Sequence, residues 1–217
     1  RTPGVAVVVG ADRFEAGRLA EREDLGDLFI LDDGFQHRGL YRNVDLLTID
    51  PEEWAAGEKL LPTGRWREPK SAIQRAQAAC IQEKRGATIP QLPIPAFRIQ
   101  TVIDGIYRGC DPVDLDTLRG HKIVAFAGIA KPGRFFEALE SLGVPIARRI
   151  EFRDHHSFTP EEIEKISNKE TNAILVTTEK DSVRLEGMGL GNFLHLRISA
   201  NISEFDRLMI LIRSRLS

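Results

Sequence analysis

Two neighbouring carboxylates, Asp32 and Asp33, have the clearest potential for chemistry in this sequence. They follow the apolar run Leu28–Leu31 and precede Gly34, a pattern typical of a short buried strand that ends in a tight turn. Ligands of open α/β sheets bind beyond the carboxyl ends of the strands, and adjacent carboxylates repel each other unless a cation shares them. The pattern therefore indicates either a Mg²⁺ site that also holds nucleotide phosphates or a simple turn at the end of a strand.

A polar loop follows the acid pair directly. Its residues Gln36, His37 and Arg38 could orient a phosphate or a substrate hydroxyl, and a solvated loop would have the same composition.

A second loop, over residues 61–69, carries Arg67 and Glu68 side by side. A guanidinium there could bind a phosphate and a carboxylate could hold metal-bound water, whereas a surface loop with solvated charges is the alternative. The end of this region resembles a phosphate-binding loop, but Pro69 stands where the second glycine is required and lacks the backbone donor. We therefore reject residues 64–71 as such a loop.

The second half of the chain has its own polar clusters. Asp154, His155 and His156 join a predicted strand to a predicted helix, a suitable place for acid–base chemistry. On an extended loop the two imidazoles point apart, which disfavours a shared metal and favours one functional histidine. Residues 126–136 form a strand, a small-residue turn and a helix, which could receive an anion or be a tight structural turn. Residues 177–181 add hydroxyls and both signs of charge, typical of a salt-bridge network.

These clusters must be positioned by alternating strands and helices, which predict an α/β fold with a parallel, doubly wound sheet. The proline-rich segment 89–95 cannot continue a helix and indicates a junction between two domains. Thr159, Pro160 and Glu162 carry the signature of a capped helix start. The expected strands are 5–9, 28–31, 44–49, 78–82, 97–103 with a partner near Tyr107, 123–126, 146–152, 174–177 and 193–198, and the expected helices are 13–24, 70–77, 133–142, 160–167 and 203–213.

Composition narrows the classes of protein. The 217 residues carry 30 Lys and Arg against 32 Asp and Glu, so nothing suggests a nucleic-acid binder. Cys80 and Cys110 are far apart and lack the spacing of metal ligands. Several polar clusters at predicted strand ends favour an enzyme with a site between two α/β domains.

Taken together, these motifs resemble the tetraacyldisaccharide 4'-kinase family, the lipid A 4'-kinases of Gram-negative bacteria. The resemblance rests on motifs that occur in the family's order: Val9-Gly10-Ala11-Asp12-Arg13, Asp32-Asp33-Gly34-Phe35-Gln36-His37, Leu61-Pro62-x-Gly64-x-x-Arg67-Glu68-Pro69, Ala127-Gly128-Ile129, Asp154-His155-His156-x-Phe158-Thr159 and Thr178-Glu179-Lys180-Asp181.

The resemblance implies a P-loop-kinase-like domain, a strand-pair linker and a smaller α/β domain. We expect residues 1–88 to form the C-terminal part of the P-loop nucleotide-binding domain, 89–108 the linker, and 109–217 a Rossmann-like domain. The implied activity is transfer of the γ-phosphoryl group of ATP to the 4'-hydroxyl of a tetraacyldisaccharide 1-phosphate. The acylated lipid substrate implies a location at the cytoplasmic face of the bacterial inner membrane.

The resemblance also implies roles for individual residues. Asp32 and Asp33 match the acids that serve Mg²⁺, with Asp33 also a catalytic candidate. His155 matches a histidine thought to support the catalytic Asp of the family. The candidates for the ATP site are Gln36, His37, Arg67 and Glu68.

Two features of the family do not occur in this sequence: a Walker A loop and a Gly-Asp-Glu segment with the proposed catalytic base. We expect both upstream of Arg1, together with an apolar helix that contacts the membrane, and we expect these 217 residues alone to be inactive. The alternatives are a non-catalytic α/β module that binds a nucleotide or a partner, and a Mg²⁺-dependent phosphotransferase acting on a soluble sugar.

Overall fold

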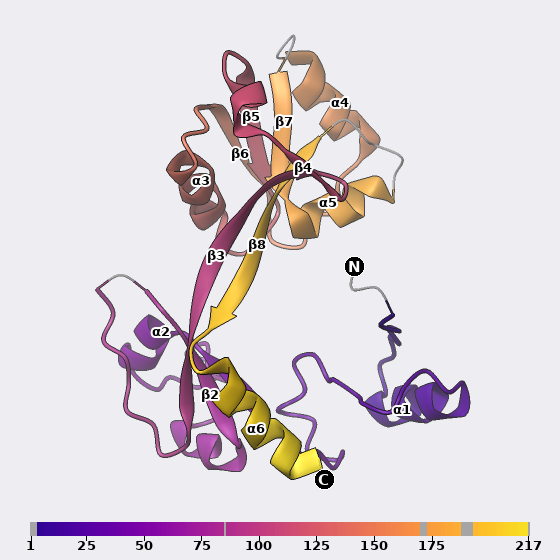
Figure 1. The fold of residues 1–217 in the computed structure, drawn as a ribbon, viewed down its shortest axis with the longest axis vertical. Helices are drawn as coiled ribbons and strands as arrows, with labels where there is room; N and C mark the ends of the chain where they lie inside the picture. The colour runs from indigo at the N-terminus through magenta and orange to yellow at the C-terminus, as the bar shows by residue number, and fades with distance from the viewer. Residues whose placement is uncertain (1–3, 85, 170–172, 188–192, 217) are drawn as a thin grey trace. The chain divides into compact units, whose positions relative to one another are not determined.

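The computed structural model describes residues 4–84, 86–169, 173–187 and 193–216. The chain has the predicted α/β fold (Figure 1). Its sheet is mostly parallel, with the strand order β1-β2-β3-β8-β7-β5-β6. The chain divides into two compact units: Arg1–Ile99 with Ile202–Ser217, and Gln100–Asn201. Each unit is described by itself below.

The first unit is built around β2 (Ala78–Gln82), which pairs in parallel with β1 (Leu46–Ile49) and with the start of β3 (Ala96–Arg108). Both faces of β2 are buried, since its residues alternate between two apolar clusters. Its helices are α1 (Arg13–Arg22), α2 (Pro51–Ala55), the 3-10 helix η1 (Lys70–Arg75) and α6 (Phe205–Leu216).

The second unit is built around β5 (Lys122–Ala127), which lies between β6 (Ile146–Glu151) and β7 (Ala173–Thr178) in a parallel sheet. Alternate residues of β5 pack into two different cores. One core contains α3 (Pro132–Ser141), and the other contains α4 (Pro160–Lys169) and α5 (Glu179–Glu186), so helices cover both faces of this sheet (Figure 1). The remaining elements are β4 (Asp111–Val113), η2 (Leu115–Leu118) and β8 (Leu194–Ile202).

Two predicted strands are wrong. Residues 5–9 and 28–31 are not strands in the described structure, and most of their apolar side chains are exposed, reaching 90% for Val9 and 88% for Ile30. The acid pair therefore follows an irregular segment and not a strand. An apolar run forms a buried strand only where neighbouring strands pair with its backbone and cover its faces, and the described residues supply no such partner for either run.

Other differences are smaller. Residues 97–103 and Tyr107 lie on one continuous strand, β3, and the antiparallel partner of its end is β4, with Ile106 opposite Val113. The helix expected from residue 70 is a 3-10 helix. The helix expected from Ser203 begins at Phe205, because the backbone of Glu204 is left-handed, with φ of 55°, and the Ser203 hydroxyl accepts a hydrogen bond from the backbone of Arg98.

The predicted domain boundaries stay predictions, but the compact units differ from them at the C-terminus. Helix α6 was expected in the second domain, whereas its Leu208 packs against Ala78, Cys80 and Phe97 of the first unit. No helix in the described parts of the chain is both long enough and apolar enough to cross a bilayer.

Candidate functional site

In the first unit, the structure brings the loop after the acid pair next to the loop that carries Arg67. The guanidinium of Arg67 donates to Asp33 Oδ2 over 2.7 Å and to Gln36 Oε1 over 3.5 Å. Asp33 has a left-handed backbone, with φ of 52°, which aspartate tolerates better than most residues. Since the side chains of Arg67 and Asp33 are more than half exposed, this ion pair adds little to stability and remains accessible to a ligand.

Glu68 pairs with Arg75, and Gln36 is a side-chain partner of both Glu68 and Arg67. The two carboxylate oxygens of Glu68 accept hydrogen bonds of 2.7 and 2.9 Å from the two terminal nitrogens of Arg75. The Arg75 guanidinium lies 4.3 Å from the ring centroid of Phe35, so this pair also joins the two loops. The hydrogen bonds from Arg75 hold the pKa of Glu68 below its usual range, with smaller contributions from the charges of Arg75 and Arg38.

The other candidates of this unit are Asp32 and His37, which are both exposed. The carbonyl of His37 accepts a hydrogen bond from Arg42. Within the described residues, no group of three or more His, Cys, Asp or Glu could hold a metal. Two carboxylates nevertheless fit Mg²⁺ by chemistry, because this ion usually takes one or two carboxylates and completes its shell with water and phosphates.

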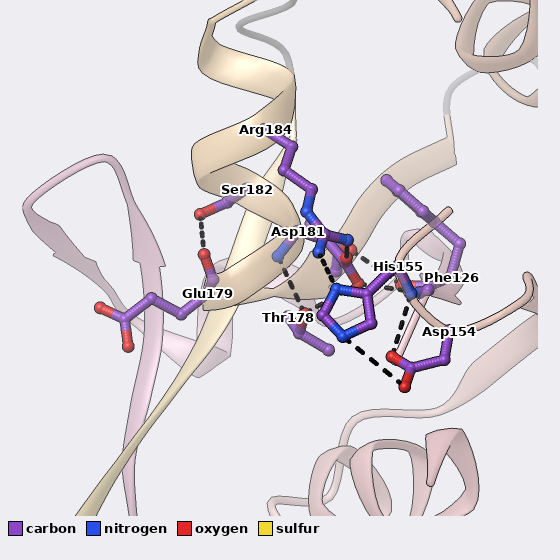
Figure 2. A network of polar contacts seen from close by, with 10 residues as sticks. Phe126, Asp154, His155, Thr178, Glu179, Asp181, Ser182 and Arg184 are labelled. Carbon is purple, nitrogen blue, oxygen red and sulfur yellow. Dashed lines mark hydrogen bonds and ion pairs between the residues drawn. The ribbon is translucent and has the colours of Figure 1, made fainter. Parts of the chain in front are cut away.

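In the second unit, His155 lies in the loop between β6 and α4 with its imidazole between two charged groups (Figure 2). Arg184 Nη2 lies 3.1 Å from Nδ1, and a carboxylate oxygen of Asp154 lies 3.8 Å from Nε2. The His155 backbone is left-handed, with φ of 58°, and its N–H donates to the carbonyl of Gly128 and to Asp154. The side chain of His155 is 69% exposed, so a substrate or a second catalytic group can reach it.

Behind this ring lies a fully buried carboxylate, Asp181, at the start of α5. Asp181 Oδ2 accepts from the Gly128 N–H over 2.8 Å and from the Thr178 hydroxyl over 2.9 Å, while Oδ1 accepts from Arg184 over 3.2 Å. The Gly128 donor, which could have served an anion, is therefore used within the protein. Its turn is structural, as the second interpretation of residues 126–136 predicted.

Gly128 has little room for a side chain. A Cβ atom there would lie 3.2 Å from the ring of Phe158 and 3.3 Å from Cβ of His156. His156 itself turns away from His155: its Nε2 lies 3.0 Å from Glu162, and its ring stacks on Phe152. Glu162 also completes the predicted capping box with Thr159, through bonds of 3.0 and 3.3 Å, which confirms the predicted helix start.

Sequence reasoning missed Arg75 and Arg184, which contact the candidates Glu68 and His155. A signal for Arg184 exists, because Thr178 followed by acids at positions 179 and 181 is typical of a helix start. A helix beginning there places Arg184 one turn after Asp181, on the same face.

Three comparisons with known proteins identify relatives. All residues from 1 to 217 match the model of the family described as LpxK, tetraacyldisaccharide-1-P 4'-kinase. A tetraacyldisaccharide 4'-kinase from Koribacter versatilis is 39% identical over 211 residues, covering 92% of this chain and 61% of that protein. One from Geobacter metallireducens is 37% identical, covering 84% of this chain and 56% of the relative.

A solved structure shares the fold. The crystal structure of "apo" form LpxK from Aquifex aeolicus in complex with ATP matches with a TM-score of 0.77 and 28% identity, over 94% of this chain and 62% of that one. The present chain therefore spans less than two thirds of the length of each of these relatives.

Proposed function

Since the chain belongs to the tetraacyldisaccharide-1-P 4'-kinase family, we propose that it forms part of an enzyme that phosphorylates the 4'-hydroxyl of a tetraacyldisaccharide 1-phosphate with ATP. The observation that carries this proposal is the family match over the whole chain. The ATP in the related crystal structure supports the choice of nucleotide.

In this proposal the first unit holds the phosphates of ATP. Arg67 offers its guanidinium to a phosphate, and its present contacts with Asp33 and Gln36 keep it beside the acid pair. Asp32 and Asp33 are the residues that would hold Mg²⁺, which when bound neutralises charge on the transferred phosphoryl group. His37, which is exposed in the same loop, is the further candidate for contact with the nucleotide.

Glu68 takes a revised role in the proposal. Because Arg75 occupies both of its oxygens, Glu68 contributes by fixing the loop that carries Arg67. The stacking of Arg75 on Phe35 supports this, since it connects that loop to the one that follows the acid pair.

His155 is the proposed contribution of the second unit to transfer. Its exposed imidazole, with a carboxylate on one side and a guanidinium on the other, suits a group that orients and supports a general base. That base would lie outside residues 1–217. Because the substrate is acylated, we propose that the enzyme acts at the cytoplasmic face of the inner membrane. Its contact with the membrane would be made by a segment that also lies outside these residues.

The test is phosphate transfer by the full-length protein from radiolabelled Mg²⁺–ATP to two acceptors, the tetraacyldisaccharide 1-phosphate and the same disaccharide 1-phosphate without acyl chains. Transfer only to the acylated acceptor is the expected result. Equal transfer to the soluble acceptor would indicate a sugar kinase, and nucleotide binding without transfer to either would indicate a binding module.

A further inference from the structure

Arg184 lies against the candidate catalytic histidine without being part of any motif described above. Its guanidinium has one terminal nitrogen on Asp181 Oδ1, at 3.2 Å, and the other on His155 Nδ1, at 3.1 Å (Figure 2). The rigid, planar fork of arginine is suited to such a double contact, which a single ammonium group cannot reproduce with the same geometry.

The contact with His155 has a defined direction. A guanidinium has five N–H donors and no acceptor, so Nδ1 of His155 must accept the hydrogen bond with its lone pair. In a neutral imidazole the proton then resides on Nε2. Nε2 is the nitrogen that faces the carboxylate of Asp154, at 3.8 Å.

The support behind Arg184 is fixed. Asp181 is fully buried and is held by two further donors, the Gly128 N–H and the Thr178 hydroxyl. Gly128 also binds the loop of His155 directly, since its carbonyl accepts the His155 N–H over 3.1 Å. Gly128 therefore fixes the backbone of His155, and Asp181, which Gly128 holds in place, fixes the guanidinium that contacts the His155 ring.

We infer that Arg184 is a positioning residue that holds His155 in one orientation, with Nδ1 as acceptor and Nε2 carrying the proton. This inference rests on the proposed function for the role of His155. In the enzyme, the Nε2–H of His155 then points as a hydrogen-bond donor toward the acidic group that His155 supports. Asp181 anchors Arg184 and takes no part in the reaction itself.

The primary test is the ¹⁵N spectrum of the full-length protein labelled at histidine, with His155 assigned by comparison with His155→Gln. In the neutral imidazole of His155 we expect an unprotonated Nδ1 and a protonated Nε2, whose ¹⁵N chemical shifts lie at opposite ends of the range for histidine. In Arg184→Met the tautomers exchange, and the two shifts move toward each other. Arg119→Met is the matched control, because Arg119 also forms an i,i+3 ion pair, with Asp116, and it should leave the spectrum unchanged.

Arg184→Lys is a second variant for the case that Arg184→Met does not fold, because lysine keeps the positive charge and one bond to Asp181. We expect the same movement of the His155 shifts in this variant, with an unchanged melting temperature. Identical His155 shifts in the unaltered protein and in folded Arg184→Met or Arg184→Lys would overturn the inference.

Kinase activity separates this inference from the proposed function. If both hold, Arg184→Met lowers kcat about tenfold or more, as loss of an orienting partner typically does, while the KM for ATP stays unchanged. Full activity in His155→Ala would contradict the proposed role of His155 in transfer, and the imidazole spectrum would still decide whether Arg184 sets the tautomer.

Discussion

Arg67 donates a hydrogen bond of 2.7 Å to Asp33, although 34 positions separate the two residues. The contact joins the acid pair to the loop of residues 61–69, two motifs whose sequences alone fit either a binding site or an ordinary surface loop. Because both side chains are largely exposed, the pair is better suited to binding than to stabilising the fold.

We therefore predict that Arg67→Gln weakens ATP binding by the full-length protein at least tenfold, since a charge-assisted bond to phosphate is worth about 1.5–3 kcal/mol. The free energy of unfolding should change by less than about 0.5 kcal/mol. Calorimetric titration with ATP and urea unfolding measure the two quantities.

Arg65→Gln is the matched control, because Arg65 lies in the same loop in an exposed ion pair with Glu53. It should bind ATP as the unaltered protein does. Equal losses of affinity in the two variants would show that only the net charge of the loop matters.

Glu68→Gln should act mainly on stability. Glu68 makes two hydrogen bonds to Arg75, and both side chains are less than one third exposed. We therefore expect the free energy of unfolding to fall by about 1–2 kcal/mol at neutral pH. Arg75 lowers the pKa of Glu68, so this stability is present above the unfolded value of about 4.3 and is lost as the pH falls through the lower folded pKa.

Urea unfolding at neutral and acidic pH measures this effect, and the difference between Glu68→Gln and the unaltered chain should shrink in acid. Glu53→Gln is the control and should be close to neutral. Unchanged stability with a large loss of ATP affinity would instead assign Glu68 to direct contact with the nucleotide.

Gly128→Ala should disturb the His155 loop. The new methyl group would meet the Phe158 ring at 3.2 Å and His156 Cβ at 3.3 Å, so the loop must shift, at a cost of about 1–3 kcal/mol. Thermal unfolding measures the cost. Gly133→Ala, with open space around its Cβ, should not lower stability, and equal behaviour of the two variants would contradict the close packing at Gly128.

His195 gives a pH prediction. It is 3% exposed, and neither ring nitrogen has a hydrogen-bond partner among the described residues. Burial lowers its pKa, so the unfolded chain binds the proton more readily, and the free energy of unfolding should fall as the pH drops below the unfolded value of about 6.5. Urea unfolding on either side of that pH measures the decline.

His195→Met, which has a similar volume and no ionisable group, should weaken this pH dependence. His121→Gln, at an exposed position, should retain it. An unchanged decline in His195→Met would show that the dependence comes from other groups.

Much of the fold could be predicted from sequence because the central strands of the second unit, β5 and β7, each have their own apolar run. The apolar runs at residues 5–9 and 28–31 gave wrong predictions. Their pattern is typical of a buried strand, but a strand also needs a neighbouring strand to pair with, which the pattern does not reveal. Tertiary packing decided the placement of α6, whose Leu208 joins the core of the first unit.

The candidate residues could be found by type and by strand-end position, but their partners could not. Arg75 reaches Glu68 through a 3-10 helix, and Arg184 reaches His155 over 29 positions through a helix that was not predicted. Contacts of this kind depend on how loops and helices meet in space, which the pattern of a single segment does not contain.

The position of the new phosphate on the lipid decides whether the chain forms part of a lipid 4'-kinase, as we propose. The measurement is ³¹P NMR of the lipid recovered after the full-length protein has acted on tetraacyldisaccharide 1-phosphate with Mg²⁺ and ATP. We predict a second phosphate monoester signal, assigned to the 4' position by coupling to its proton. A recovered lipid that carries only the original 1-phosphate, or a new phosphate at another hydroxyl, would contradict it.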